Sequence, residues 1–340
     1  MNKNLKSFLE VLGVLVITCI IAMTSPFNPW ANVGFTEMQE EILDIAHSVR
    51  EGYLAYVDLG GNYGPVIYEF YGLGYLLTET HIVHFIMELV LIFASVYFLY
   101  RSAKLYTSEI FALMCAAIPT VFGWGALTST GPEMILFFIM SLTVYHVTRQ
   151  LKYGFLSYHT YLLAIDMALV IFIQPGYAVL WFIILLFFAV MFKVNNINDK
   201  EYKSFWMSIL EGIVTVSIPM GLYLWYFNNA SSFIEQVINY NFNNMGNLAA
   251  GLKIILGTPW SLLIALQLVV IIVKALKGES FIDLCCWLGL IAAAVIVIAL
   301  QGDVNPHSIE LLKALYVVPL ASTFAFLDEP LGLSAEERKF

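Results

Sequence analysis

Long apolar stretches recur along almost the whole chain and are separated by short polar connectors. Their lengths are close to the roughly 20 residues that a helix needs to cross a bilayer, and packed bundles tolerate about 17. Alternating barrel strands of about ten residues are absent from the sequence, and a backbone in hydrocarbon must satisfy its amides within its own segment. The pattern therefore predicts an all-α polytopic transmembrane bundle of about ten spans, at residues 8–24, 82–100, 107–124, 132–148, 158–173, 176–193, 206–227, 255–276, 281–300 and 311–327.

A shorter apolar run, at 64–77, is not counted as a span. It is rich in aromatic residues, is interrupted by Gly72 and Gly74, and carries Glu69. We expect an interfacial or re-entrant helix here, inside a long first external loop over residues 25–81.

A capping box predicts a second helix in the same loop. Thr36 is placed to cap its N-terminus and Gln39 to reach back to the cap, so the helix is expected over 36–51. Apolar residues repeat on one of its faces and carboxylates on another, a pattern typical of a helix that lies along a membrane surface.

Basic residues indicate the orientation of the bundle. With ten crossings and a cytoplasmic N-terminus, only Arg50, Lys253 and Lys313 of the 16 Lys and Arg residues fall outside the cytoplasm. Such an asymmetry orients membrane proteins, and counting the short aromatic run as a span would destroy it. Both termini are therefore predicted to be cytoplasmic, with one transmembrane domain over 1–327 and a short tail over 328–340. The alternative that the first span is a cleaved signal peptide lacks a clear small-residue cleavage site.

The composition excludes several classes of protein. With 60% hydrophobic and 12% charged residues, the chain differs from water-soluble domains, in which about a quarter of residues are charged. The net charge of -9, without any cluster of Lys or Arg, excludes nucleic acid as a partner. The four cysteines lie inside apolar runs, which argues against a zinc site or a disulfide framework. No Walker-type glycine loop occurs, which excludes an ABC-type ATPase.

The first external loop carries the most organised chemistry. Glu37 stands at the first position of the expected helix, where unpaired amides and the helix dipole favour a negative charge and would keep the carboxylate available as a base. The same placement also simply stabilises a helix, so that this local signal leaves both interpretations open.

The order of features along the chain adds to this signal. An acidic residue and an amphipathic helix are followed by Tyr56-Val57-Asp58, by the run Asn62 to Tyr68 (NYGPVIY) and by an aromatic short helix. This order resembles the GT-C class of polytopic glycosyltransferases, the superfamily of protein O-mannosyltransferases and lipid A aminoarabinose transferase. The turn Ser129 to Phe138, with Glu133, and the late segments Pro306-His307 and Tyr316 to Leu320 are similar to further external turns of that class.

The resemblance implies an activity and a set of roles. A polyprenyl-phosphate sugar is the expected donor, and a glycan, lipid or protein on the extracytoplasmic side is the expected acceptor, with inversion at the sugar. Glu37 is the expected general base, although most relatives have Asp there. Asp58 and Glu133 are expected to support it by positioning the acceptor or by binding metal. The expected location is a bacterial cytoplasmic membrane, with membrane lipid as a further partner.

Departure of the phosphate requires compensating positive charge. Relatives often carry Lys or Arg near the Gly-Pro step, where this chain has a tyrosine. The predicted substrate-binding residues are Tyr63, Tyr68, His84, Lys253 and His307, and Arg50 is a further candidate cation for the leaving phosphate. A divalent metal, Mg²⁺ or Mn²⁺, held by Glu37, Asp58 and Glu133 is the alternative source of charge.

Some of these residues also have a purely structural interpretation. His84 and Glu88 stand four apart and can pair with each other. The loop from Asn228 to Lys253 is rich in Asn and aromatic residues, which suits either a sugar site or an ordinary polar loop.

Two rival functions remain at this level. A transporter or lipid flippase would show paired broken helices in two corresponding halves, and Asp166 near Pro175-Gly176 is one such place without a matching second. A non-catalytic relative that keeps the bundle as a scaffold is the other rival, because a fold does not guarantee a function.

Overall fold

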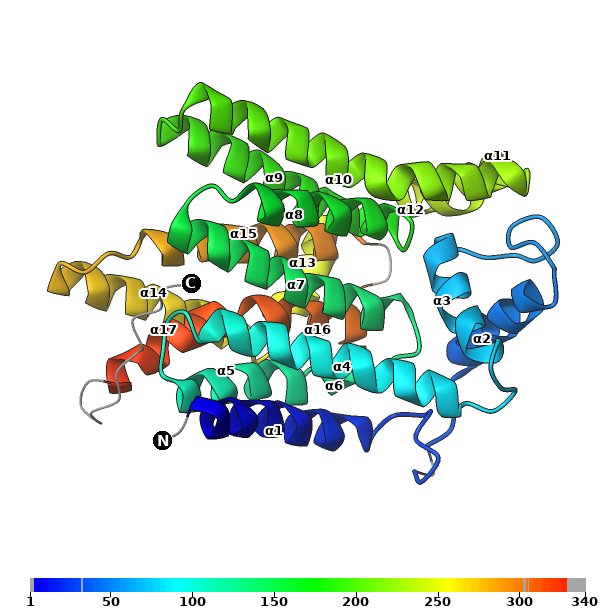
Figure 1. The fold of residues 1–340 in the computed structure, drawn as a ribbon, viewed down its shortest axis with the longest axis horizontal. Helices are drawn as coiled ribbons and strands as arrows, with labels where there is room; N and C mark the ends of the chain where they lie inside the picture. The colour runs from blue at the N-terminus through cyan, green and yellow to red at the C-terminus, as the bar shows by residue number, and fades with distance from the viewer. Residues whose placement is uncertain (1–2, 32, 302–303, 305, 329–340) are drawn as a thin grey trace.

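The computed structural model describes residues 3–31, 33–301, 304 and 306–328, and in this part of the chain the regular structure is helical (Figure 1). The helices that make up the bundle are α1 (Lys3–Ala22), α4 (Ile82–Ala103), α5 (Glu109–Val121), α7 (Pro132–Tyr153), α8 (Ser157–Ile171), α9 (Pro175–Val194), α10 (Asp199–Tyr226), α13 (Leu248–Leu256), α14 (Ser261–Lys277), α15 (Ile282–Ala299), α16 (Pro306–Leu315) and α17 (Val317–Asp328). Shorter elements connect them: α2 (Glu37–Arg50), α3 (Pro65–Tyr75), α6 (Trp124–Leu127), α11 (Ala230–Phe233), the π-helix η1 (Ile234–Asn239) and α12 (Tyr240–Asn243).

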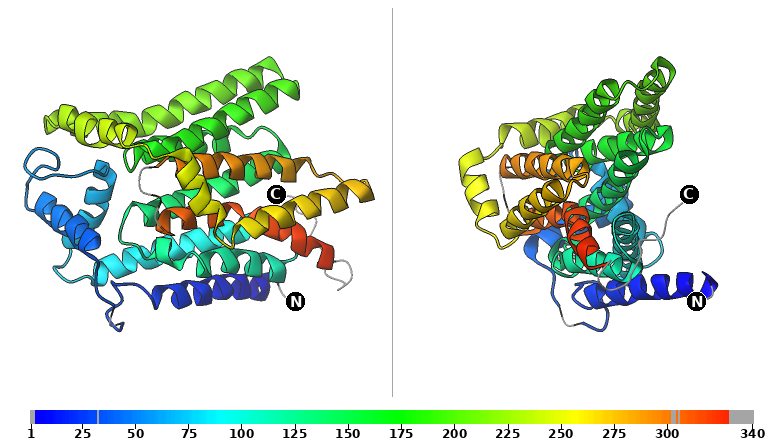
Figure 2. Two further views of the ribbon diagram at one scale, coloured as in Figure 1. Left: turned by 180° about the vertical axis from the view of Figure 1, so that it is seen from behind. Right: turned by 90° about the vertical axis from the view of Figure 1, so that its left-hand side faces the viewer.

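The long helices run back and forth between two ends of the molecule (Figure 1). The helices α2 and α3 cover one end, which we call the loop end. The first residues of α1 and the last residues of α17 lie at the opposite end, as the view from behind also shows (Figure 2). The central helix is α7, which packs against α4, α8 and α16 and is the most enclosed of the long helices.

Five helices of the described chain are long and apolar enough to cross a membrane: α4, α7, α9, α10 and α15. Two further candidates are bent pairs, in which α13 and α14 meet at 76° and α16 and α17 at 45°. The remaining three predicted spans correspond to shorter apolar helices, Ser7–Ala22 within α1, α5 and α8. The all-helical multi-pass architecture is therefore confirmed at five to seven candidate spans, whereas the count of ten and the side of each terminus stay predictions.

Both helices expected in the first loop are present. Thr36 caps α2, its hydroxyl accepting a hydrogen bond from the Gln39 backbone N–H while the Gln39 side chain accepts one from the Thr36 N–H. Helix α3 is short, begins with Pro65, and lies outside the set of candidate spans. It packs beside α2, and the location of this helix pair at the membrane surface stays a prediction.

Charged residues at the end opposite α2 and α3 tie neighbouring helices together. Lys104 after α4 pairs with Glu10 of α1 at 2.6 Å and with Glu109 of α5 at 2.7 Å. Lys152 at the end of α7 lies 3.6 Å from Asp283 at the start of α15. These ion pairs lie in or beside the short connectors at the end where the sequence predicted most of the basic residues.

Candidate functional site

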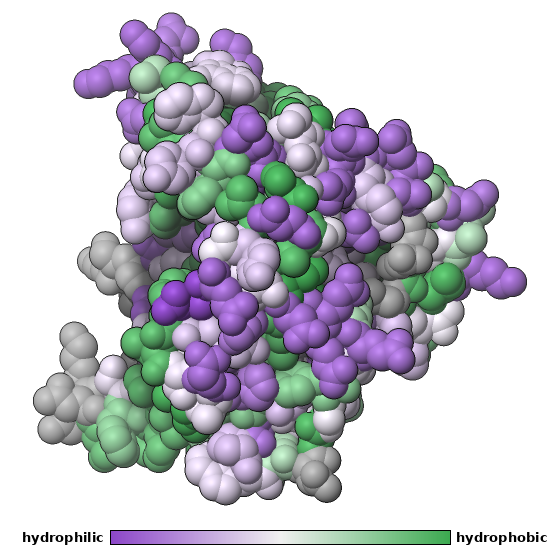
Figure 3. All heavy atoms as spheres, turned by 90° about the vertical axis from the view of Figure 1, so that its right-hand side faces the viewer, coloured by the Kyte–Doolittle hydropathy of each residue, from purple (hydrophilic) through white to green (hydrophobic). Residues whose placement is uncertain are grey.

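A polar cavity of about 210 Å³ lies at the loop end of the bundle. Figure 3 looks onto this end and shows hydrophilic residues gathered across it. Five side-chain amides line the cavity: Asn62, Gln174, Asn241, Asn244 and Gln301. The remaining lining residues are Met38, Tyr63, Glu133, Tyr240 and Ser308. Amides both donate to and accept from hydroxyl groups, and tyrosine rings stack on apolar ring faces, so this lining suits a polyhydroxylated ligand.

Three helices begin at the polar cavity, each with proline as its first residue. Helix α7 starts at Pro132, α9 at Pro175 and α16 at Pro306. Proline is favoured at this position because the missing N–H would have no partner in the helix. Since each helix start carries about half a positive charge, the three together favour a negative group in the cavity.

Backbone hydrogen bonds hold the first loop against this end of the bundle. The N–H of Gly64 donates to the carbonyl oxygen of Ile173 at 2.8 Å, and the N–H of Val66 donates to that of Phe172 at 3.2 Å. At the start of α2, the Gln39 side-chain amide donates to the carbonyl oxygen of Ser129 at 2.5 Å. These contacts hold the segment with Asn62 and Tyr63 beside the turn between α8 and α9, and the start of α2 beside the turn that precedes α7.

Glu133 is the carboxylate of the polar cavity and is only 4% exposed. The Gly131 backbone lies close to this carboxylate. A Cβ atom added to Gly131 would stand 2.9 Å from the Glu133 Oε2 atom and 3.6 Å from the Ser129 hydroxyl oxygen. Burial and the nearby Glu133 raise the pKa of Tyr63 above its usual range, so this hydroxyl stays protonated and can act as a donor. A protonated phenol and a carboxylate therefore share one cavity.

Several polar atoms around Glu133 have no partner within the described part of the chain. They are the hydroxyl oxygens of Ser129 and Thr130 and the Oε1 atom of Gln174, all buried. Thr130 also has a positive φ of 50°, an unusual backbone conformation for a β-branched residue. Buried polar groups without partners are rare, and strained residues gather at functional sites, so both features mark this turn.

An apolar groove of about 360 Å³ lies next to the polar cavity. It is lined by Met167, Ile171, Pro175, Ala178, Val179, Phe182, Ile238 and Phe242. The segment from η1 to α12 forms a shared wall, because Ile238 and Phe242 line the groove while Tyr240 and Asn241 line the cavity. The helical repeat explains this division, since residues four apart lie on one face.

The structure separates the three carboxylates to which the sequence assigned catalysis. Glu37 is exposed and lies outside the cavity lining, although the next residue, Met38, is part of it. Asp58 is also exposed, and its Oδ2 atom accepts a hydrogen bond from the Leu54 N–H at 2.8 Å, which closes its own turn. Of the three, Glu133 alone lines the cavity.

This separation corrects the expected metal site. Within the residues that the structure describes, no group of three or more His, Cys, Asp or Glu side chains is placed to hold a metal ion. Glu37, Asp58 and Glu133 are not assembled because the capping box fixes the first at a helix start and the local turn holds the second.

Of the five predicted substrate-binding residues, only Tyr63 lines the polar cavity. Tyr68 is buried and packs against Tyr56, whose hydroxyl donates to the Tyr63 carbonyl oxygen at 2.7 Å. Tyr68 therefore supports the loop that carries Tyr63.

The three basic candidates lie outside the cavity lining. His84 is buried with its Nε2 atom 2.8 Å from the Tyr71 carbonyl oxygen, and it stacks on Phe27. It does not pair with Glu88, whose carboxylate accepts a hydrogen bond from the Ser25 hydroxyl. Lys253 is exposed on α13. His307 stands next to the lining residue Ser308 and lies 4.0 Å from Glu310.

The amide residues of the cavity were not among the predicted site residues. Gln174 lies in the tight turn between two apolar helices, and Gln301 follows the last residues of α15. Each is a polar residue at the edge of an apolar run, which is the signal that could have found them. Asn241 and Asn244 belong to the Asn-rich loop, for which two interpretations were open, and they line the site.

Comparison with known proteins returned no relative: no family model, no curated protein and no solved structure matches this chain.

Proposed function

We propose that this chain is a membrane glycosyltransferase that moves a sugar from a polyprenyl-phosphate donor to an acceptor on the extracytoplasmic side, with inversion at the sugar. The observation that carries the proposal is the pairing of an amide-lined cavity containing a buried carboxylate with an adjacent apolar groove. A lipid-linked sugar needs a polar site for its sugar and an apolar site for its lipid chain, and the two sites must adjoin each other. The resemblance of the loop motifs to GT-C enzymes supports the same activity.

Each surface has a part in the proposed reaction. The sugar occupies the polar cavity, where the amides of Asn62, Gln174 and Asn241 bind its hydroxyls, and the lipid chain lies along the groove. Glu133 takes the proton from the acceptor hydroxyl while the oxygen of that hydroxyl attacks the anomeric carbon of the sugar. The bond from that carbon to the phosphate oxygen breaks, and the phosphate leaves with the electron pair.

The proposal places the general base on Glu133 instead of Glu37. A general base must stand within hydrogen-bond reach of the proton that it removes, and Glu133 faces the cavity while Glu37 is exposed on α2. No Lys, Arg or His is among the described residues that line the cavity. The helix starts at Pro132, Pro175 and Pro306 supply the positive potential that the leaving phosphate needs.

A transfer assay on the purified chain in proteoliposomes tests the base. With radiolabelled polyprenyl-phosphate sugars as donors, we expect Glu133→Gln to lower the rate by about a hundredfold to ten-thousandfold, the usual contribution of a general base. Glu37→Gln is the matched control and should retain the wild-type rate. If Glu37→Gln abolished transfer and Glu133→Gln did not, the base would belong to the first loop. If the wild-type chain used no lipid-linked sugar, the proposed function would be wrong.

The structure supports a transporter less well than a transferase. The two bent helix pairs both lie in the last third of the chain, whereas a transporter repeat would place them in corresponding halves. The buried Asp166 accepts a hydrogen bond from the Thr143 hydroxyl at 2.9 Å, and Thr143 accepts one from the Trp181 indole at 2.7 Å. Such a network satisfies the carboxyl group within the bundle. The polar cavity lies at helix ends, where a substrate for transfer would bind.

A further inference from the structure

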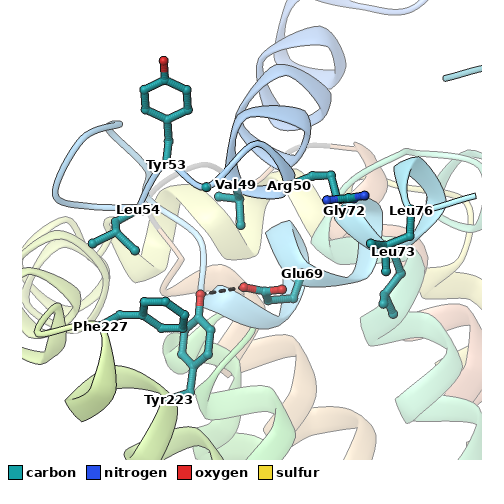
Figure 4. Close-up of a pocket in the computed structure, with 11 residues that line it drawn as sticks. Val49, Arg50, Tyr53, Leu54, Glu69, Gly72, Leu73, Leu76, Tyr223 and Phe227 are labelled. Atoms are coloured by element: carbon teal, nitrogen blue, oxygen red, sulfur yellow. Dashed lines mark hydrogen bonds between the residues drawn. The ribbon is translucent and has the colours of Figure 1, made fainter. Parts of the chain in front are cut away.

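A second cavity, of about 370 Å³, lies between α2, α3 and the end of α10 (Figure 4). Its walls include Arg50 from α2, Glu69 and Leu73 from α3, and Tyr223 from α10. The residues that directly follow α3 and α10, Leu76 and Phe227, complete them. We call it the three-helix cavity. It shares no lining residue with the polar cavity, and neither the resemblance nor the proposed transfer reaction gives it a role.

Two opposite charges line this cavity without neutralising each other. Arg50 is exposed and forms no ion pair or hydrogen bond with the described part of the chain. The Glu69 carboxylate accepts a hydrogen bond from the Tyr223 hydroxyl at 2.6 Å. In Figure 4 the Glu69 carboxylate is directed toward the Tyr223 hydroxyl, and no bond joins it to the Arg50 guanidinium. A ligand that carries both a negative and a positive group would satisfy the two side chains together.

Apolar and aromatic residues at the rim place the cavity at the surface of the membrane. Leu73, on α3, and Leu76, directly after it, are apolar and yet 53% and 50% exposed. Trp225 and Tyr226 do not line the cavity, but they lie in the last turn of α10 between the lining residues Tyr223 and Phe227 and are 75% and 76% exposed. Trp and Tyr gather at the level of lipid headgroups, and exposed leucines at that level contact acyl chains.

We propose that the three-helix cavity binds a phospholipid whose headgroup combines a phosphate with a primary amine, as in phosphatidylethanolamine. Arg50 binds the phosphate, Glu69 accepts hydrogen bonds from the ammonium group, and an acyl chain lies against Leu73 and Leu76. A phosphatidylglycerol headgroup would offer Glu69 only uncharged hydroxyl groups, without the cation that strengthens a hydrogen bond to a carboxylate. A phosphatidylcholine headgroup has no N–H to donate to Glu69. This inference does not depend on the transfer activity.

Native mass spectrometry of the purified full chain in detergent tests the proposal. Phosphatidylethanolamine, phosphatidylglycerol and phosphatidylcholine with identical acyl chains are the probes. We expect the ethanolamine lipid to bind at least about tenfold more tightly than the other two, since a charge-assisted hydrogen bond changes affinity by about tenfold to a hundredfold. Arg50→Gln should weaken its binding by a similar factor. Glu69→Gln, which keeps an acceptor for the Tyr223 hydroxyl, should abolish the preference over phosphatidylcholine.

Controls separate this site from general charge effects and from misfolding. Glu51→Gln changes the exposed residue next to Arg50, and Lys253→Gln removes an exposed cation on α13; both should bind the ethanolamine lipid as the wild type does. Arg50→Lys should retain most of the binding. Equal binding of the three lipids, or an unchanged preference in both Arg50→Gln and Glu69→Gln, would overturn the proposal. Displacement of the lipid by an equal concentration of free phosphoethanolamine would overturn it as well, because the ligand would then be a soluble molecule.

Discussion

At the scale of single residues, the turn before α7 fixes where the Glu133 carboxylate stands. Gly131 leaves room for the carboxylate, Pro132 starts the helix, and Thr130 carries the unusual backbone conformation that reverses the chain. Glu133 occupies the second position of α7, directly after the proline that starts the helix.

Gly131→Ala tests this arrangement. The added methyl group would stand 2.9 Å from the Glu133 Oε2 atom, and because this is the end of a flexible side chain, the carboxylate would move instead of the backbone. We expect transfer to fall by about a hundredfold, the cost of a misplacement of about 1 Å, while the unfolding midpoint in detergent stays near that of the wild type.

Gly289→Ala in α15 is the control, because no atom lies within 4 Å of the position that its Cβ would take. It should retain full transfer activity. An unchanged transfer rate in Gly131→Ala would mean that the position of the Glu133 carboxylate does not limit the reaction.

At the scale of elements, the site depends on how the first loop docks on the end of α8. The loop is held by backbone hydrogen bonds to Phe172 and Ile173, which require the Gly64 backbone to approach closely. A side chain at position 64 would interfere directly, since a Cβ atom there would lie 1.9 Å from the Phe172 carbonyl oxygen. Gly64 is therefore needed for the first loop to dock on the end of α8, and this docking gives the polar cavity its shape.

We expect Gly64→Ala to destabilise the protein by about 1–3 kcal/mol, because the clash involves backbone on both sides and cannot be relieved by a side-chain rotation. The unfolding midpoint in detergent, followed by tryptophan fluorescence, measures the effect. Gly289→Ala again serves as the matched control. A midpoint for Gly64→Ala equal to that of the wild type would show that the loop is not held at this point.

At the scale of the whole molecule, the two ends of the bundle differ in chemistry. The polar cavity, the three-helix cavity and the loop helices share one end, while the ion-paired connectors such as Lys104 and Lys152 share the other. A membrane protein keeps its short basic connectors in the cytoplasm, so we expect both cavities to face the extracytoplasmic side.

Cysteine accessibility in intact cells tests this orientation. In a variant without Cys19, Cys115, Cys285 and Cys286, Asn244→Cys should react with a membrane-impermeant maleimide without permeabilisation. Lys200→Cys at the start of α10 should react only after the membrane has been opened. The reverse pattern would place the polar cavity in the cytoplasm and exclude an extracytoplasmic transfer reaction.

The sequence alone was enough to predict the elements that depend on local rules. Apolar runs predicted the helices, and the pattern of Thr36 and Gln39 predicted the start of α2, because burial in lipid and helix capping act within a few residues of the chain. The breaks within the last spans were not predicted, since the residues that bend there remain apolar and keep the composition of a span.

The tertiary structure decided which side chains meet. Glu133 and Tyr63 are distant in sequence and line one cavity because Gly64 docks on Ile173 and Gln39 on Ser129. Glu37, which has the better local signal, is exposed and lies outside the lining of that cavity. Helix signals arise from neighbours along the chain, whereas the composition of a cavity depends on contacts between segments that hydropathy does not encode.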